Sequence, residues 1–299
     1  MKIAFLGQKG IPAKSNGVEK HMEEVAIRLT KKGHEVFLFP PLLRALFQNF
    51  DVIHFPFSFS KTFIFFISIF KRKTACIRIK IPQGVDVSYD ENSEYLKKFN
   101  LQKGSYILSS GRLNKKSGIH NLILAFKNLE DKHLSREKKL IIIGNGSSKD
   151  EYFKELKDCA RGRENIIFVA DQTDEISRQL FSHAYCFVES SESEKTPFAL
   201  LEAMGYGKAV LSRGTKKNIE ALRDEAGLIF RLDNAHDLEE KLVFLINNPV
   251  IAKKIGEKAM FKAKMEFSWE KITNQIETAY EDAILQKGKV LNKSYERNI

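Results

Sequence analysis

The sequence predicts an α/β protein built from two Rossmann-like domains with parallel sheets, of which the N-terminal one is shortened. After Ser105, short apolar runs alternate with longer amphipathic runs, which is the pattern of βα units feeding a parallel sheet. The N-terminal part begins in the same way, and a hydrophobic content of 43% over 299 residues is enough for a core in each domain. The expected domains are residues 1–82, residues 83–267, and a C-terminal helix with a polar tail, residues 268–299, which packs back on the N-terminal domain.

The N-terminal domain starts with one βαβ unit. Its strands are expected at residues 2–6 and 35–39, and its helix at 18–32, where Gly33 supplies a helix stop. A further strand is expected at 51–55. These three strands should form one small parallel sheet.

A strongly apolar run at residues 62–70 follows these strands. It holds about nine residues, fewer than the roughly 20 that a membrane-spanning helix needs, so a buried helix is expected. The alternative is an interfacial membrane contact, because the basic residues 71–73 adjoin the aromatic side chains of this run.

The second domain shows the alternation most clearly. Strands are expected at residues 106–109, 140–144, 166–169, 185–189, 209–212 and 227–230. Helices are expected at residues 119–129, 150–160, 175–182, 198–206 and 238–246. Together they predict a doubly wound α/β domain.

The end of the chain is expected to form a capped helix over residues 268–286. Ser268 is the expected N-cap, and Ile272, Ile276 and Tyr280 lie on one face. This apolar face needs cover, which the N-terminal half can give. The remaining residues, 287–299, form a polar tail.

The chain carries a formal charge of +11 and has a pI near 9.3, which favours an anionic partner. Nucleotide diphosphates, acidic membrane surfaces and nucleic acids all qualify. Because the basic residues are scattered and no nucleic-acid-binding module is visible, a nucleic-acid partner is not expected. The three cysteines fit neither a disulfide framework nor a metal site, so a reducing cytoplasm is the expected location.

The most informative pair of residues is Glu194 and Glu202, which stand eight positions apart. The first falls in a loop after a strand and the second in the following helix, so both can face the carboxyl edge of the sheet. There a carboxylate can accept both hydroxyls of a ribose, and a helix N-terminus can hold phosphate oxygens. The alternative is two surface glutamates in a Glu-rich loop, since Glu189 and Glu192 lie close by.

Two other strand ends carry candidate binding residues. Arg112 follows a strand, and its planar guanidinium group suits phosphate oxygens, although a plain salt bridge is the alternative. Gly144 and Gly146 form a tight turn after another strand, where a base or ribose could approach the backbone. A turn without a ligand is the alternative reading.

Several motifs occur in order along the chain: MKIAFLGQKGIPA (1–13), NGVE (16–19), GHEV (33–36), IPQGVD (81–86), GRL (111–113) with GI (118–119), GNG (144–146), EKTPFALLEAMG (194–205) and FSW (267–269). In this order they resemble the family-four retaining glycosyltransferases, which have the two-Rossmann GT-B fold. The resemblance covers nearly the whole chain, and the EKTPFALLEAMG stretch matches the E-x7-E motif of that family.

The resemblance implies a role for each matching residue. Glu202 would bind the nucleotide ribose, Glu194 would face the hydroxyls of the donor sugar as a catalytic residue, and Arg112 would clamp the diphosphate. The implied donor site also contains Gly17, Lys116, Gly144, Gly146, Lys195, Thr196 and Phe198. No cofactor and no metal are expected, because side-chain cations and helix N-termini would neutralise the leaving group and no Asp-x-Asp pair lies in a plausible site.

The chain departs from the family pattern in the donor site. Ser117 stands where the family has a diphosphate-binding lysine, and Lys116 lies one position earlier. Lys195 and Pro197 occur in a loop that is normally glycine-rich, and proline offers no N–H to an anion. Asn16 replaces the first glycine of a Gly-Gly pair, a mild change because Asn tolerates left-handed backbone angles.

The largest departure is a loss of length in the N-terminal domain. Only about 40 residues separate Phe39 from Ile81, where a full Rossmann half of roughly 100 to 150 residues would need more elements. The family's catalytic histidine falls in one of the missing stretches. His54, at the end of a predicted strand, is the candidate replacement, and a structural role for it is the alternative.

The resulting hypothesis is a retaining hexosyltransferase that moves a sugar from a nucleotide-diphosphate donor to a saccharide or lipid-linked acceptor. It would work in the cytoplasm, with possible peripheral contact to the inner face of the membrane, in the synthesis of cell-envelope polysaccharide. One alternative is a catalytically degenerate homologue that binds nucleotide sugar or serves as a partner subunit. Another is a basic adaptor for membranes or nucleic acid, whose binding would weaken steeply with salt.

Overall fold

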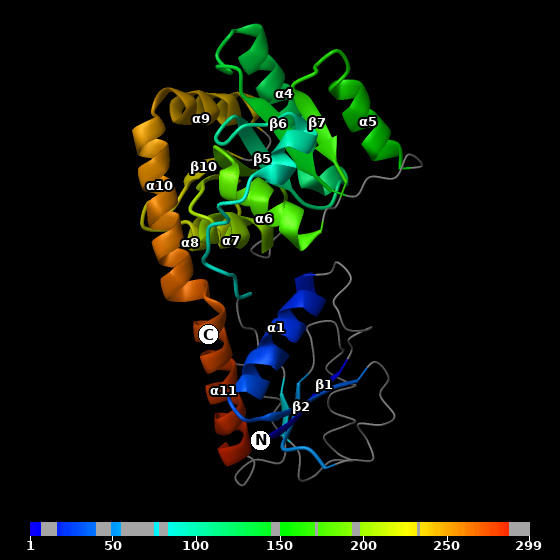
Figure 1. Ribbon diagram of the computed structural model, residues 1–299, viewed down its shortest axis with the longest axis vertical. Coiled ribbons are helices and arrows are strands. Elements are labelled where there is room, and N and C mark those ends of the chain that lie inside the picture. Colours follow the sequence, from blue (N-terminus) through cyan, green and yellow to red (C-terminus); the bar gives the residue numbers. More distant parts are fainter. Residues whose placement is uncertain are drawn as a thin grey trace. The chain divides into compact units, whose positions relative to one another are not determined.

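The computed structural model describes residues 1–6, 17–39, 49–54, 75–77, 83–144, 150–170, 173–192, 198–231 and 234–286. The chain forms two compact units. Unit 1 contains Met1–Gly84 and Glu266–Ile299, and unit 2 contains Val85–Met265. Each unit has its own parallel sheet (Figure 1).

The sheet of unit 1 has the strand order β2-β1-β3-β4, with all neighbours parallel. Its elements are β1 (Lys2–Leu6), α1 (Gly17–Lys31), β2 (Glu35–Phe39), β3 (Val52–His54) and β4 (Ala75–Ile77). The predicted sheet of three parallel strands is therefore confirmed. The fourth strand, β4, was not expected.

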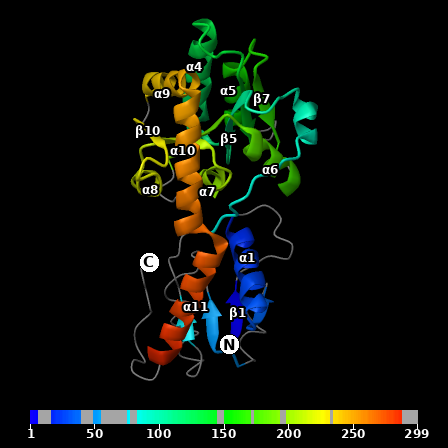
Figure 2. The ribbon, with the colours of Figure 1, turned by 60° about the vertical axis from the view of Figure 1, so that its left-hand side comes forward.

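The helix α11 (Trp269–Gln286) packs against the sheet and helix of unit 1 (Figure 2). Its buried side chains Trp269, Ile272, Ile276 and Tyr280 join a core with residues of β1, α1 and β3. The predicted cap is present, because the Lys271 N–H donates to Ser268 Oγ at 3.4 Å. Residues from the two ends of the chain thus build one core.

The sheet of unit 2 has the strand order β10-β9-β8-β5-β6-β7, and its neighbours are parallel. The strands are β5 (Tyr106–Ser110), β6 (Lys139–Ile143), β7 (Ile166–Val169), β8 (Cys186–Glu189), β9 (Ala209–Arg213) and β10 (Leu228–Phe230). Each expected strand lies within one or two residues of an observed one. The order is that of a doubly wound Rossmann domain, as predicted.

Helices cover both faces of this sheet (Figure 1). They are α4 (Ile119–Asp131), α5 (Glu151–Cys159), α6 (Asp174–His183), α7 (Phe198–Gly205), α8 (Lys216–Ala221), α9 (Ala235–Asn247) and α10 (Pro249–Lys262), with short turns η1 (Glu94–Phe99), η2 (Lys115–Ser117) and η3 (Ala263–Phe267). One face packs on α4, α5 and α9, and the other lies near Phe181 of α6. The helices α8 and α10 were not predicted from the sequence.

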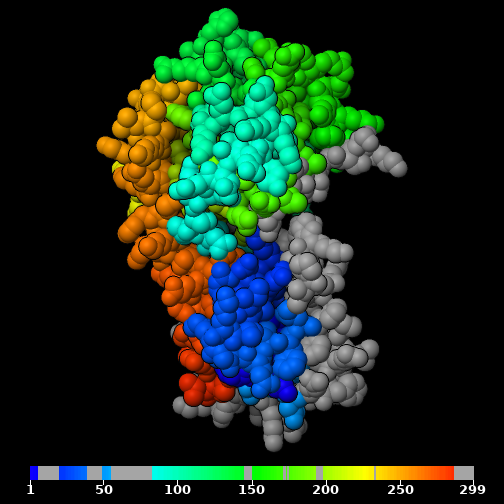
Figure 3. All heavy atoms as spheres, in the orientation of Figure 1, coloured from blue at the N-terminus to red at the C-terminus, as the bar shows by residue number. Residues whose placement is uncertain are grey.

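The segment before β5 lies over α6 and is coloured cyan in Figure 3. Tyr89 OH is 3.0 Å from His183 Nδ1, and the Tyr95 N–H donates to Gln179 Oε1 at 3.0 Å. Burial of the hydrogen-bonded His183 lowers its pKa. These contacts hold the segment before β5 against α6.

Some expectations fall outside the described residues. They are the helix at 62–70, the loop residues 145–149 and 193–197, and the tail at 287–299. Among the helices that the structure does describe, none combines the length and the apolar character needed to cross a bilayer.

Candidate functional site

The candidate site lies in unit 2, where β5 and β8 are neighbours although they are far apart in sequence. The chain continues from β5 toward β6 on one side and from β8 toward β9 on the other. The loops that leave the carboxyl ends of these two strands therefore diverge. In open parallel sheets, ligands bind in the crevice at such a switch point.

The loop after β5 brings two exposed cations to this edge. Arg112 follows the last strand residue by two positions, and Lys116 lies in η2. Neither forms an ion pair with another residue in the described parts of the chain. Asn114 shapes the turn, because its side chain accepts the Lys116 N–H at 3.0 Å. Both cations are thus presented to solvent by a fixed turn.

Glycines allow close backbone contacts in this region. A Cβ atom on Gly144 would lie 2.3 Å from the carbonyl oxygen of Gly111. Gly118, with φ 65°, is the N-cap of α4, and a Cβ there would lie 2.3 Å from the carbonyl oxygen of Ser190. Only glycine fits these positions without displacement of the backbone.

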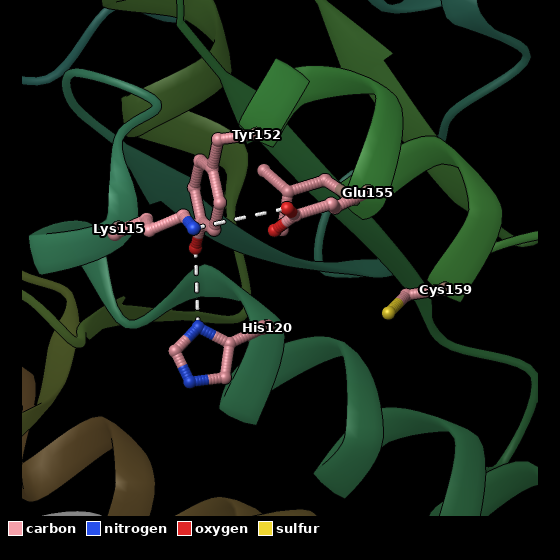
Figure 4. Close-up of a pocket in the computed structure, with 6 residues that line it drawn as sticks. Lys115, His120, Tyr152, Glu155 and Cys159 are labelled. Atoms are coloured by element: carbon pink, nitrogen blue, oxygen red, sulfur yellow. Dashed lines mark hydrogen bonds and ion pairs between the residues drawn. The ribbon is translucent and has the colours of Figure 1, made fainter.

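The neighbouring lysine and serine of η2 face a different place. Lys115 Nζ lies 3.9 Å from Glu155 Oε1 of α5, in a pocket of about 350 Å³ that also includes His120 (Figure 4). Ser117 is buried, with Oγ 3.5 Å from Tyr152 OH. The position that carries the family's lysine is therefore used for packing in this chain, and Lys116 is the exposed cation beside it.

The segment after β8 starts with a buried carboxyl group. Glu189 is 5% exposed and accepts the Ser191 N–H at 2.9 Å. Burial raises its pKa, although the hydrogen bond from Ser191 opposes the shift. Glu189, the last residue of β8, is therefore a buried carboxyl group and not a surface glutamate, and the two readings of Glu194 and Glu202 stay open.

Residues 190–192, which follow β8, also bond to the loop after β5 and to the end of β9. Ser190 Oγ donates to the Ser117 carbonyl at 2.7 Å, and the Glu192 N–H donates to the Lys116 carbonyl at 2.9 Å. The Glu192 carboxylate lies 3.1 Å from Arg213 Nη1 at the end of β9. The sequence did not point to Arg213, because a charged residue at the end of a predicted strand gives no sign of its partner. The order of the strands in the sheet brings it next to Glu192.

Two predicted residues lie on α7, which follows this segment. Phe198 is its first residue and is half-buried, as is Glu202 one turn later. Burial and the nearby Glu202 carboxylate raise the pKa of Tyr206. Glu194, Lys195, Thr196 and Gly146 lie outside the described residues.

The remaining candidates belong to unit 1. Gly17 is the first residue of α1. His54 ends β3 and is 6% exposed, with Nδ1 2.5 Å from Tyr280 OH and its ring 4.9 Å from that of Phe5. Burial, with a contribution from His21, lowers the pKa of His54 to about 3. These contacts give His54 a structural role, and a catalytic role remains a prediction.

Two curated glycosyltransferases are similar to this chain in sequence. An uncharacterized glycosyltransferase of Methanocaldococcus jannaschii is 23% identical over 207 residues, 69% of this chain and 52% of that protein. The capsular polysaccharide biosynthesis glycosyltransferase CapM of Staphylococcus aureus is 23% identical over 193 residues, 64% of this chain and 50% of CapM. The chain thus spans about half the length of these curated relatives.

Solved structures of GT-B glycosyltransferases have the same architecture. Sucrose-phosphate synthase from Thermosynechococcus elongatus superposes with a TM-score of 0.73 at 14% identity, covering 95% of this chain and 99% of that one. HepE of Anabaena, in complex with UDP and glucose, gives a TM-score of 0.72 at 16% identity, covering 94% and 100%. At this level of identity the likeness shows the fold.

The family described as Glycosyl transferases group 1 matches residues 91–260, more than half of the chain. The match spans β5 to α10 and so contains the switch point, both exposed cations and Glu202. The chain belongs to the group 1 glycosyltransferases.

Proposed function

We propose that this protein transfers a hexose from a nucleotide-diphosphate sugar to a hydroxyl group of a saccharide or lipid-linked acceptor, with retention of the anomeric configuration. The observation that carries the proposal is the pair of exposed cations, Arg112 and Lys116, beside the β5–β8 switch point. HepE, solved with UDP and glucose, and CapM, named for capsular polysaccharide synthesis, support this substrate class.

The charges at the sheet edge suit a diphosphate leaving group. In the transfer, the acceptor oxygen bonds to the anomeric carbon, the bond from that carbon to the diphosphate breaks, and the acceptor proton is released. Arg112 can form two parallel hydrogen bonds to phosphate oxygens, and Lys116 adds a point charge. The departing negative charge is then stabilised by side chains of the chain itself, without a metal.

The other site residues act on the donor's sugar groups. Glu202 accepts hydrogen bonds from the ribose hydroxyls, since its carboxylate lies on α7 next to the phosphate-binding edge. Glu194, eight positions earlier, faces the hydroxyls of the transferred sugar. Gly144 directly follows the neighbouring strand β6, where its lack of a side chain lets the loops after β5 and β6 pack closely beside the proposed nucleoside site.

A location at the cytoplasmic face of a membrane is consistent with this activity. A lipid-linked acceptor lies in such a surface, and the formal charge of +11 attracts the protein to anionic lipid. Cell-envelope polysaccharide is the matching product class, as the name of CapM suggests.

A second candidate is a homologue that binds nucleotide sugar without turnover, alone or as a partner subunit. The observation that favours it is the burial of His54 against Tyr280, which leaves the ring without access to a reacting sugar in the described arrangement. If His54 is catalytic, His54→Ala abolishes transfer while nucleotide binding persists. Unchanged transfer in His54→Ala would show that catalysis does not depend on it.

A thermal-shift panel of UDP-, GDP- and dTDP-sugars tests donor binding. A donor present at about 100 times its Kd stabilises the folded state by about 2.7 kcal/mol, which raises Tm measurably. No shift with any donor would contradict the proposal. With the donor known, the anomeric configuration of the product, read by NMR, tests retention, and the rate of product formation separates the enzyme from the non-catalytic homologue.

A further inference from the structure

Three strand-end segments of unit 2 meet at Glu192. Its main-chain N–H donates to the Lys116 carbonyl of the loop after β5, at 2.9 Å. Its carboxylate lies 3.1 Å from Arg213 Nη1, at the end of β9. Glu192 itself belongs to the segment after β8, so one residue links the ends of three adjacent strands.

The burial of Arg213 distinguishes this ion pair from an ordinary surface ion pair. The Arg213 side chain is 6% exposed, whereas that of Glu192 is 43% exposed. A nearly buried guanidinium group is destabilised by the loss of a carboxylate partner, because its charge is poorly solvated. Arg213, at the end of β9, therefore holds the Glu192 carboxylate in place.

The link acts on the backbone of η2. Ser190 Oγ holds the next carbonyl, that of Ser117, at 2.7 Å, and Gly118 is in close contact with the Ser190 carbonyl. Lys116 lies in the middle of this turn, with its carbonyl held by Glu192 and its side chain exposed. A shift of Glu192 would therefore move the backbone from which the Lys116 side chain extends.

We infer that Glu192 and Arg213 are positioning residues that hold the backbone of Lys116 where its ammonium group meets the diphosphate of the donor. The inference rests on the proposed function, since it assigns the diphosphate to this edge. Displacement of a charged group by about 1 Å can cost on the order of 100-fold in a catalytic step, so a fixed backbone matters.

The chain offers a matched control for the loss of such a carboxylate. Lys262 in α10 is also 6% exposed and lies 2.7 Å from Asp224, which is 81% exposed. Neither residue belongs to the β5, β8 or β9 segments. Asp224→Asn and Glu192→Gln each neutralise the partner of a nearly buried cation, but only the second touches the loop of Lys116.

Calorimetric titration of both variants with UDP and UMP, and with GDP and GMP, tests the inference. Glu192→Gln is expected to weaken diphosphate binding about 10-fold, or about 1.4 kcal/mol, and monophosphate binding much less. Asp224→Asn is expected to bind both as the wild type does. Equal losses for both ligands in Glu192→Gln would show general damage and overturn the inference.

A double-mutant cycle identifies the residue through which Glu192 acts. In a Lys116→Ala background, Glu192→Gln should cause no further loss of diphosphate affinity, because the group that it positions is gone. Additive losses would overturn the inference. Arg213→Lys keeps the charge and should retain more diphosphate affinity than Arg213→Gln, and equal losses in these two variants would contradict the role of the ion pair.

Hydrogen exchange separates this inference from the proposed function. The Glu192 amide, bonded to the Lys116 carbonyl, should exchange about 10-fold faster in Glu192→Gln and be unchanged in Asp224→Asn, because local opening becomes easier. Unchanged exchange at residue 192 would overturn the structural link. The exchange could change as expected while the wild type binds no nucleotide. The structural link would then stand, but the proposed function would fail, and so would the assignment of the link to a diphosphate.

Discussion

Both units carry polar residues at the ends of parallel strands, but Arg112 and Lys116 of unit 2 are exposed, whereas His54 of unit 1 is buried. In unit 2, Arg112 and Lys116 follow β5 and are exposed at the switch point. In unit 1, His54 ends β3 and is closed off by Tyr280 of α11 and by Phe5. A strand end therefore offers a site only where no other element covers it, and in unit 1 the cover comes from the opposite end of the chain.

The largest expected effect comes from truncation of Trp269, which α11 contributes to the core of unit 1. Trp269 is 3% exposed, and a Cβ on Gly84 would lie 2.2 Å from its ring. Trp269→Ala is expected to destabilise unit 1 by about 3–5 kcal/mol, because a large aromatic side chain leaves a cavity. Denaturant unfolding followed by circular dichroism measures the loss. Phe244→Ala, at a 41% exposed position of α9, should change stability little, and a similar loss in both variants would contradict the claim.

The contact between the loops of unit 2 is tested by a pair of glycines with similar backbone angles. Gly118 (φ 65°) is in contact with the Ser190 carbonyl, whereas Gly104 (φ 71°) has no atom within 4 Å of an added Cβ. Gly118→Ala should cost about 2–4 kcal/mol, since backbone strain adds to overpacking, and Gly104→Ala only about 1–2 kcal/mol. Thermal unfolding of both variants measures the difference. Equal costs would mean that the loop yields to the added methyl group.

A measurement of donor affinity tests the proposed site at the exposed strand ends of unit 2. Glu202→Ala is expected to weaken nucleotide binding by about 1–3 kcal/mol, because hydrogen bonds to a charged carboxylate are lost. Isothermal titration calorimetry gives the change, and Glu240→Ala, at a 64% exposed side chain of α9, is the control. Unchanged affinity in Glu202→Ala would remove this residue from the site.

The contributions of His54 in unit 1 and Glu189 in unit 2 to the pH dependence of stability should have opposite signs. The pKa of His54 is about 3 in the folded chain, against 6.5 for the free side chain. Between these values the unfolded chain binds a proton that the folded chain excludes, so the stability of unit 1 is full above pH 6.5 and falls toward pH 3. The expected loss is up to about 1.4 kcal/mol per pH unit for this histidine. The fluorescence of Trp269, the single tryptophan, reports it in denaturant titrations at pH 7.5 and 5.5.

Controls for this pH effect come from the titrating residues themselves. His54→Phe should show a shallower fall in stability on acidification, although it loses the Tyr280 contact. Glu189 has the opposite sign, because burial raises its pKa and the stability of unit 2 falls as the pH rises above its ordinary value near 4.5. Glu189→Gln should remove that part of the slope. The same slope in His54→Phe and wild type would assign the acid sensitivity to other groups, with His21 as the first candidate.

The sequence by itself determined most of the local structure. Apolar runs bounded by polar loops located the strands, because a strand buried on both faces must be continuously apolar. Ser268 marked the start of α11, since its hydroxyl caps the helix. The placement of Arg112, Lys116 and Gly144 at one edge also followed, because the carboxyl ends of parallel strands share an edge. By contrast, α10 was missed, because its exposed face carries Val250 and Phe261 and blurs the amphipathic pattern.

Only the tertiary structure decided which of these residues meet. Glu189 is buried although its stretch is rich in glutamate, and His54, for which the sequence left a catalytic and a structural role open, packs against Tyr280. Arg213 reaches Glu192 because β9 lies next to β8. Local periodicity determines which face of an element is apolar. The partner of that face is chosen by the free energy of burying it against segments far away in the chain, and no local pattern records that choice.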